Sequence, residues 1–112
     1  MEQSAMYGLI GKMRCTPGNR DQLASILLEG TTAMPGCLSY IVANDSTDAD
    51  ALWITEVWDS AASHRASLAL PAVQQAIAKG KPLIAGFGER FETNPLGGVG
   101  MSTTTPQPQR AE

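Results

Sequence analysis

The feature that most constrains the fold of this chain is a pair of short apolar segments on either side of a polar turn. Cys37–Ala43 and Ala51–Trp58 are rich in the β-branched and aromatic residues that favour strands. Residues 44–50 (NDSTDAD), which lie between them, consist largely of the Asp, Asn and Ser that favour turns. The pattern predicts a β-hairpin, with the two strands as antiparallel neighbours in a sheet.

Both of these strands carry bulky side chains on both of their faces. In Ala51–Trp58 the side chains of Trp53 and Val57 point to one face, and those of Ile54 and Trp58 point to the other. A sheet covered by helices on one face and by water on the other should instead alternate apolar with polar residues. We therefore predict a homodimer, in which two copies pack sheet face to sheet face with two-fold symmetry. The alternative is that Trp53 is a single exposed aromatic residue, as is common on protein surfaces.

The rest of the chain supplies two further strands and the helices that connect them. Strands are predicted over Met6–Arg14 and Ile84–Thr93. Apolar residues at helical spacing predict one helix that begins at Asn19 and stops before Pro35, and further helices between Ser60 and Gly80. The order strand, helix, strand, strand, helices, strand is that of a ferredoxin-like α+β fold, βαββαβ, with helices on one face of an antiparallel sheet.

Polar residues and a proline mark where these helices begin. Asn19 is expected to cap the first helix, with Gln22 three residues on completing a capping box. Asp59 and Ser60 each offer a cap to the second helix, and Pro71 suits the first position of a third.

Length and composition limit the domain organisation and the partners. The chain has 112 residues, 43% of them hydrophobic and 17% charged, which suits one packed domain. We expect this domain over residues 6–94, an N-terminal extension over 1–5, and a Gly-, Thr-, Pro- and Gln-rich tail over 95–112. The formal net charge is −3 with scattered basic residues, which argues against a nucleic-acid partner. Neither a bilayer-spanning run nor a signal-like apolar stretch is present, so a cytoplasmic protein without a membrane partner is expected.

The chain lacks the usual sequence signatures of metal and cofactor sites. Cys15 and Cys37 do not belong to a C-x-x-C pair, and there is a single histidine, His64. Gly86 and Gly88 fall inside a predicted strand, where glycine favours a β-bulge or close backbone approach rather than a phosphate-binding loop. We therefore expect no metal and no cofactor.

The residues best suited to acid–base chemistry meet where the third strand joins the following helix. His64 lies on the apolar face of that helix and should point inward, and Trp58 and Glu56 share the adjoining strand face. A neutral imidazole can take a proton from an acidic hydroxyl, and a carboxylate can orient it. His64, Trp58 and Glu56 are the predicted catalytic residues. The structural alternative is that His64 is a core histidine and Glu56 an ion-pair partner of Arg65 or Arg90.

The space between sheet and helices is the expected binding pocket. A bicyclic ligand needs a cavity of roughly 300 Å³ or more there, beside Trp58 and His64. Tyr40, like Tyr7, could hydrogen-bond a ligand, although core packing explains both equally well. The candidate substrate-binding walls are Tyr7, Leu9, Met13, Ile54 and Leu68.

The stretch Trp53–His64, with its Glu56-Val57-Trp58-Asp59-Ser60 step from strand to helix, carries a resemblance to a known family. Over about residues 6–93 the chain resembles the antibiotic biosynthesis monooxygenase family, which comprises small dimeric α+β barrels. The resemblance implies oxidation of a hydroxylated polycyclic or quinol-type aromatic by O₂, without metal or flavin. An electron-rich phenolate can reduce triplet O₂ by one electron and then recombine with it. The protein need only remove a proton, exclude water and hold the ring.

The resemblance places the family's pocket residues on this chain in part. Trp58 stands where aromatic oxygenases of the family have a pocket tryptophan, and His64 where they have a tyrosine. Ile54 and Ile77 stand where they have an asparagine and an arginine. The resemblance thus implies an aromatic-oxygenase pocket with fewer polar groups.

Other functions of the same superfamily are alternatives. Haem-degrading relatives ligate iron with a histidine where this chain has Ile77, so haem is disfavoured. Relatives that isomerise phosphorylated carbonyl compounds would need clustered cations, for which Arg90 alone gives thin support. The main alternative to an enzyme is a non-catalytic dimeric barrel that binds a small hydrophobic metabolite.

Overall fold

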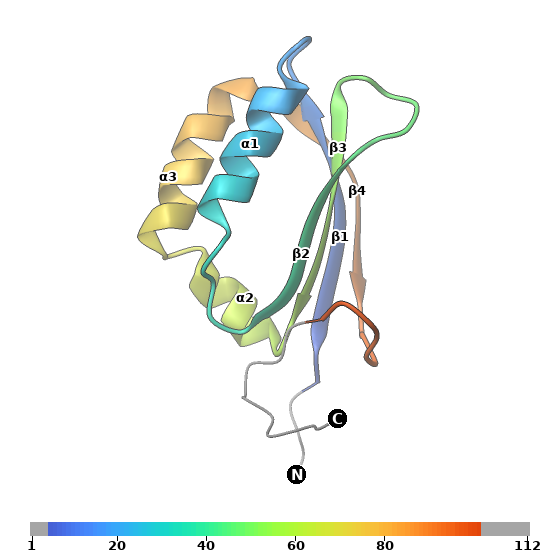
Figure 1. The fold of residues 1–112 in the computed structure, drawn as a ribbon, viewed down its shortest axis with the longest axis vertical. Coiled ribbons are helices and arrows are strands. Elements are labelled where there is room, and N and C mark those ends of the chain that lie inside the picture. Colours follow the sequence, from blue (N-terminus) through green and yellow to red (C-terminus); the bar gives the residue numbers. More distant parts are fainter. Residues whose placement is uncertain (1–4, 102–112) are drawn as a thin grey trace.

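The computed structural model describes residues 5–101, which form one antiparallel sheet with helices on one side (Figure 1). Residues 1–4 and 102–112, most of the expected extension and tail, lie outside the described part of the chain. Residues 94–101 belong to no helix or strand. No helix within the described residues is long and apolar enough to cross a membrane.

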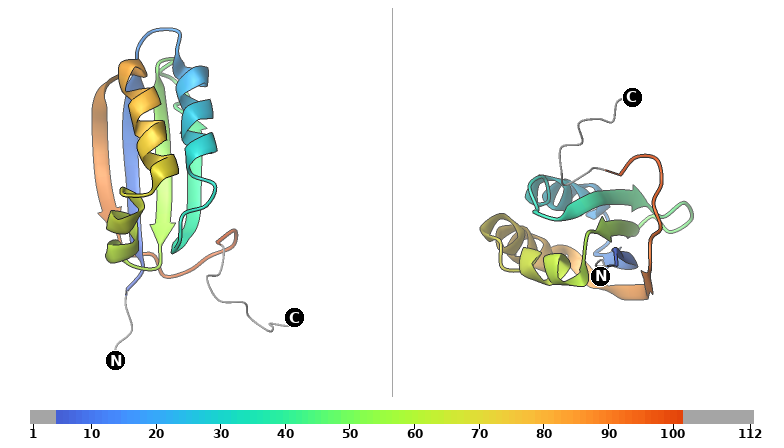
Figure 2. Two further views of the ribbon diagram at one scale, coloured as in Figure 1. Left: turned by 90° about the vertical axis from the view of Figure 1, so that its left-hand side faces the viewer. Right: turned by 90° about the horizontal axis from the view of Figure 1, so that it is seen from below.

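The sheet has four strands in the order β2-β3-β1-β4. Each neighbouring pair is antiparallel. Between β3 and β4 the chain forms helices α2 and α3 and a single 3-10 turn, and all three α-helices cover the same face of the sheet (Figure 2). This arrangement confirms the predicted ferredoxin-like α+β fold. The bounds are β1 Tyr7–Cys15, α1 Arg20–Gly30, β2 Cys37–Asn44, β3 Ala51–Trp58, α2 Ala61–Ser67, α3 Pro71–Gly80 and β4 Ile84–Thr93.

The helix starts follow the sequence signals at two of the three positions. The Ser60 side chain accepts a hydrogen bond from the Ser63 amide at 3.1 Å, and Pro71 opens α3. The predicted capping box at α1 is wrong. Asn19 precedes the helix, but its side-chain amide donates to Thr16 Oγ1 at 2.8 Å and its backbone is not extended, so it does not cap α1.

The core lies between the inner face of the sheet and helix α1. Leu23 of α1 and Leu52 of β3 are fully buried, and Cys15 and Ile54 complete the central cluster. Trp58, at the end of β3, is also buried, with 1% of its surface exposed. Helices α1 and α3 approach each other closely, because a Cβ at Gly30 would lie only 2.5 Å from that of Ala76.

The opposite face of the sheet, here called the outer face, carries no helix in the described part of the chain (Figure 2). The register places Trp53 and Val57 of β3 on this face, as predicted from their spacing. Ile41 and Phe91 on the same face are 56% and 53% exposed. The large apolar side chains of the outer face are Ile10, Ile41, Trp53, Val57 and Phe91.

Strand β4 contains a β-bulge next to β1. Gly11 pairs with Arg90 and Met13 with Phe87, so two steps on β1 are matched by three on β4. Arg90 and Phe87 therefore point to the same face, although a spacing of three in a regular strand would place them on opposite faces. The bulge lies beside Gly88, in agreement with the prediction from the glycines of this strand.

Candidate functional site

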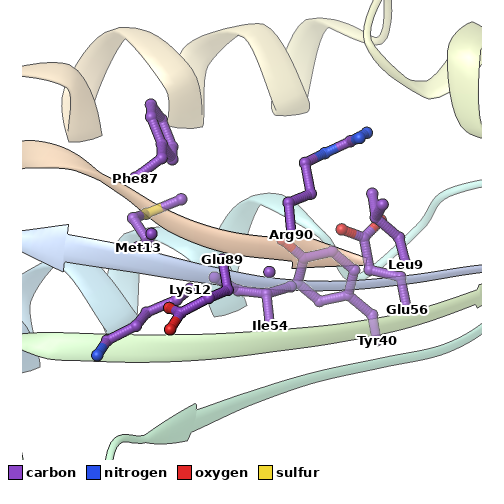
Figure 3. Close-up of a pocket in the computed structure, with 11 residues that line it drawn as sticks. Leu9, Lys12, Met13, Tyr40, Ile54, Glu56, Phe87, Glu89 and Arg90 are labelled. Carbon is purple, nitrogen blue, oxygen red and sulfur yellow. The ribbon is translucent and has the colours of Figure 1, made fainter. Parts of the chain in front are cut away.

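Two adjoining hollows lie on the inner face of the sheet. One, of about 170 Å³, lies between the sheet and helices α2 and α3, and we call it the helix-side hollow. The other, of about 480 Å³, lies along β1 and β4 where the helices leave the sheet uncovered, and we call it the β4-side hollow (Figure 3). Met13, Tyr40 and Glu56 line both, so the two hollows meet at these side chains.

Glu56 is the polar group at this junction. It projects from β3 onto the inner face, and its Oε1 accepts a hydrogen bond from Trp58 Nε1 at 2.9 Å. Burial raises the pKa of Glu56 above its ordinary value of 4.5, while the bond from Trp58 and the positive charges near it act in the opposite direction. A carboxyl group with this environment can hold or release a proton inside an apolar hollow.

His64 lies next to Glu56 at the wall of the helix-side hollow. Its ring is 5.3 Å from that of Tyr7 and 5.5 Å from that of Trp58, measured between centroids. The His64 Nε2 atom is 4.0 Å from Glu56 Oε1, beyond direct hydrogen-bond range. An oxygen atom that lies to one side of the line joining these two atoms can be within hydrogen-bond distance of both. The pair can therefore hold a hydroxyl and receive its proton.

The other predicted wall residues lie in or near these hollows, with one exception. Leu9 and Ile54 line the β4-side hollow, and Leu68 lines the helix-side hollow with about half of its surface exposed. Trp58 lines the helix-side hollow from its buried position. Tyr7 belongs to the lining of neither hollow, and its hydroxyl instead donates to Glu92 Oε2 at 2.6 Å.

Phe87 and Arg90 were not among the predicted site residues, and Tyr40 was considered only as a hydrogen-bond partner of a ligand. The structure places all three at the hollows. Tyr40 projects from β2 beside Glu56, and burial raises its pKa, so its phenol stays protonated and can donate a hydrogen bond. Phe87 and Arg90 come from the bulged part of β4. Their inward direction depends on the bulge, which strict alternation along the strand does not reveal.

The volumes bear on which hollow can hold a ligand. The helix-side hollow, beside Trp58 and His64, is smaller than the roughly 300 Å³ expected for a bicyclic ligand. The β4-side hollow reaches the required size and touches Glu56, though not His64 or Trp58. A ring of this size would therefore lie mainly along β1 and β4, with one end at the junction. Among residues 5–101 no group of three or more His, Cys, Asp or Glu side chains is arranged to hold a metal ion.

Comparison with known proteins identifies the family. The sequence profile of the antibiotic biosynthesis monooxygenase family matches residues 6–79. The chain belongs to this family. No curated protein matches the sequence significantly.

Solved structures give the same fold. A protein of Chloroflexus aurantiacus J-10-fl that carries the family name is 65% identical, with a TM-score of 0.85 over 88% of this chain and 100% of its own. One from Caulobacter crescentus CB15 that carries the same name is 17% identical, with a TM-score of 0.75 over 84% and 92% of the two chains. SnoaB, a cofactor-independent oxygenase from Streptomyces nogalater, is 12% identical, with a TM-score of 0.70 over 87% and 99%. The last two likenesses concern the fold alone.

Proposed function

We propose that this protein is a cofactor-independent monooxygenase that oxidises a hydroxylated aromatic or quinol with O₂. The observation that carries the proposal is the His64–Glu56 pair, 4.0 Å apart, at the point where two largely apolar hollows meet. Membership of the antibiotic biosynthesis monooxygenase family supports a monooxygenase-type role, and the site supports the substrate class.

The proposed reaction begins with removal of a proton. The substrate hydroxyl lies beside the pair, within hydrogen-bond distance of both His64 Nε2 and Glu56 Oε1. His64 takes its proton while Glu56 stabilises the imidazolium. The resulting phenolate transfers one electron to O₂, and the aryloxyl radical and superoxide combine at the ring carbon para to the oxygen. His64 returns the proton to the peroxide, and loss of water leaves a quinone. The sum for a naphthol is one substrate and one O₂ giving one quinone and one water.

The apolar walls contribute by holding the ring and excluding water. The hollows are lined largely by apolar side chains such as Leu9, Met13, Ile54 and Leu68. A bound ring displaces water from the His64–Glu56 pair, which strengthens the interaction between them and protects the radical pair from side reactions. Trp58 is proposed as an aromatic wall at the closed end of the helix-side hollow, held in place by its bond to Glu56.

The proposed assembly is a homodimer through the outer face. Five large apolar side chains lie there, uncovered by any helix of residues 5–101, and two of them, Ile41 and Phe91, are more than half exposed. Burying them against a second copy removes this apolar surface from water.

The test of the activity uses metal-free protein and a panel of substrates. The protein is mixed anaerobically with dihydroxynaphthalenes, anthrone and hydroquinones, and O₂ is then admitted while quinone absorbance and O₂ uptake are followed. We expect product to form faster than in buffer and, with ¹⁸O₂, to carry one labelled atom. If no member of the panel reacts faster than in buffer, the proposal fails.

A non-catalytic binding module is the second candidate. The observation that favours it is the small volume of the helix-side hollow. His64 packs there against the rings of Tyr7 and Trp58, which is what a structural role requires. A ligand of the panel that binds tightly but is not oxidised would support this function.

A further inference from the structure

The β-bulge in β4 changes which side chains the edge of the sheet presents to the β4-side hollow. Phe87 and Arg90 pair with Met13 and Gly11, which lie on the inner face. Figure 3 shows both side chains rising from β4 toward the helix layer, whereas Lys12 and Glu89 extend away from it. β-Bulges are frequent next to functional sites, where they redirect a side chain. Here the bulge brings an aromatic ring and a guanidinium together at one hollow.

Phe87 and Arg90 are available to a ligand. Phe87 is 69% exposed, an unusual position for a phenylalanine whose ring borders a hollow of about 480 Å³. Arg90 is also exposed. Its guanidinium lies near the Tyr7 hydroxyl, which donates to Glu92, and within residues 5–101 no carboxylate lies at ion-pair distance from Arg90. Gly11 lies between Arg90 and Ile54 in the sheet, and a Cβ built there would meet no atom within 4 Å. The floor of the hollow is therefore open between the β4 edge and the buried part of the site.

The separation between Glu56 at one end of the β4-side hollow and Arg90 at the other matches the length of a fused two-ring ligand. Glu56 is on β3 and Arg90 on β4, with β1 between them. Neighbouring strands are about 4.8 Å apart, so the two backbones lie on the order of 10 Å apart across the sheet. The charge of Arg90 is near enough to favour the ionised form of Glu56. A ligand that reaches both ends would be polar at each end and flat and apolar between them.

We propose that Phe87 and Arg90 form a second binding subsite, which takes an aromatic ring bearing a carboxylate. This rests on the proposed function and narrows its substrate to a hydroxyaromatic acid, with the reacting hydroxyl at Glu56 and His64 and the carboxylate at the opposite end. The planar guanidinium of Arg90 matches a carboxylate in two parallel hydrogen bonds. The Phe87 ring stacks against the aromatic ring. Because the whole chain carries a net charge of −3, any preference for an anionic ligand must arise locally.

The test is equilibrium binding under nitrogen, where no oxidation can occur. The ligands are 6-hydroxy-2-naphthoate and 2-naphthol, which share the ring and the hydroxyl and differ in the carboxylate. Each is titrated by calorimetry into wild type, Arg90→Gln, Arg90→Lys and Phe87→Ala. Lys81→Gln is the matched control, because it removes one positive charge at an exposed position outside both hollows. Circular dichroism and urea unfolding verify that each variant is folded.

We expect wild type to bind the naphthoate at least tenfold more tightly than the naphthol. Arg90→Gln should weaken the naphthoate about 10- to 100-fold and the naphthol less than threefold, Arg90→Lys should retain part of the preference, and Lys81→Gln should retain all of it. Phe87→Ala should weaken both ligands by a similar factor, about 2- to 10-fold.

Some results would overturn the subsite. These are no measurable binding of the naphthoate to wild type, no preference for it, or an equal loss for both ligands in Arg90→Gln. The two proposals fail separately. If the naphthoate binds selectively but no panel member is oxidised when O₂ is admitted, the oxygenase proposal fails and the subsite proposal stands. If panel members are oxidised but the naphthoate is not preferred over the naphthol, the subsite proposal fails and the oxygenase proposal stands.

Discussion

At the scale of single residues, the carboxyl group of Glu56 has the least ordinary environment in the site. It lies in a largely apolar hollow with 14% of its side chain exposed, and its Oε1 receives the bond from Trp58. A carboxylate that is desolvated in this way is harder to ionise than one in water. The folded protein therefore holds the Glu56 proton more tightly than the unfolded chain does.

This environment makes the contribution of Glu56 to stability depend on pH. Well below the ordinary pKa of 4.5, Glu56 is protonated in both the folded and the unfolded state. As the pH rises through 4.5 and then through the raised folded pKa, ionisation increasingly favours the unfolded chain. Glu56→Gln cannot ionise, and it keeps an oxygen that can accept from Trp58 Nε1. We expect its free energy of unfolding, relative to wild type, to increase between pH 4 and pH 7, measured by urea unfolding. A difference that falls with pH would contradict the desolvated carboxyl.

Substitution of His64 distinguishes a catalytic role of this residue from a packing role. If it is the base, His64→Ala should lower kcat about 100-fold or more on the best substrate of the panel, with ligand binding changed far less. His64→Gln is the matched variant, because it keeps much of the volume and a hydrogen-bonding side chain but is a poor base. Stopped-flow mixing with O₂ measures the rate and calorimetry the binding. An unchanged rate in both variants would assign His64 to packing.

How much of the site could be predicted differs between its residues. His64, Glu56 and Trp58 belong to a strand that runs directly into a helix, and local periodicity is enough to place them on one side. Phe87 and Arg90 depend on a change of register between strands that are distant in sequence. For Tyr7, alternation along the strand predicts which face the side chain is on. It does not predict the hydrogen bond to Glu92, which belongs to the distant strand β4.

At the scale of elements, the packing of α1 against α3 depends on a missing side chain. Gly30, the last residue of α1, faces Ala76 of α3, and a Cβ there would also lie 3.1 Å from the carbonyl oxygen of Ala72. Backbone atoms of a helix cannot move aside as a flexible side chain can. The two helices would have to separate to admit even one methyl group.

Gly30→Ala should therefore lower the free energy of unfolding by about 1–3 kcal/mol. Gly11→Ala is the matched control, because its new methyl group meets no atom within 4 Å and points into the β4-side hollow. The control should leave stability unchanged or raise it by up to about 1 kcal/mol. Urea unfolding of both variants beside wild type measures the difference, and equal stabilities would show that the helices adjust freely.

Most element boundaries could be predicted, because short-range chemistry sets them. The bounds of β3 and β4 agree with the predictions, as expected for apolar runs that end at a helix cap or a turn. The end of α1 was less predictable, since the helix stops at Gly30, several residues before Pro35. There the hydroxyl of Thr31, the residue after the helix, donates to the carbonyl of Leu27 at 2.7 Å and so satisfies a carbonyl of the last turn.

At the scale of the whole molecule, the outer face combines apolar side chains with one polar cluster. Trp53 Nε1 donates to Asp45 Oδ2 at 2.7 Å, and the Lys12 ammonium lies 3.6 Å from the same oxygen. Lys12 also lies over the Trp53 ring, 5.9 Å from its centroid. These contacts hold the indole of Trp53 on the outer face, near the turn between β2 and β3.

Replacing an apolar residue of this face by a charge should dissociate the proposed dimer. Ile41→Glu removes apolar contact and places a carboxylate at the interface, so we expect the dimer Kd to rise at least about 100-fold. Leu28→Glu is the matched control, because Leu28 is 52% exposed on α1, away from the outer face. Analytical ultracentrifugation of wild type and both variants gives the answer. A monomeric wild type would reject the assembly.

Because β4 is at the edge of the sheet, its sequence can change during evolution without disturbing the other strands. β4 pairs with β1 alone, so the pairing of the other three strands does not depend on its length. A one-residue insertion or deletion beside Gly88 would exchange the side chains on either side of β4, and with them the groups that a ligand meets. Libraries that vary the length of this short segment would therefore sample new selectivities while preserving the scaffold. Length variation here should be tolerated better than large-to-small substitution of the buried residues Leu52 and Ile54 in β3.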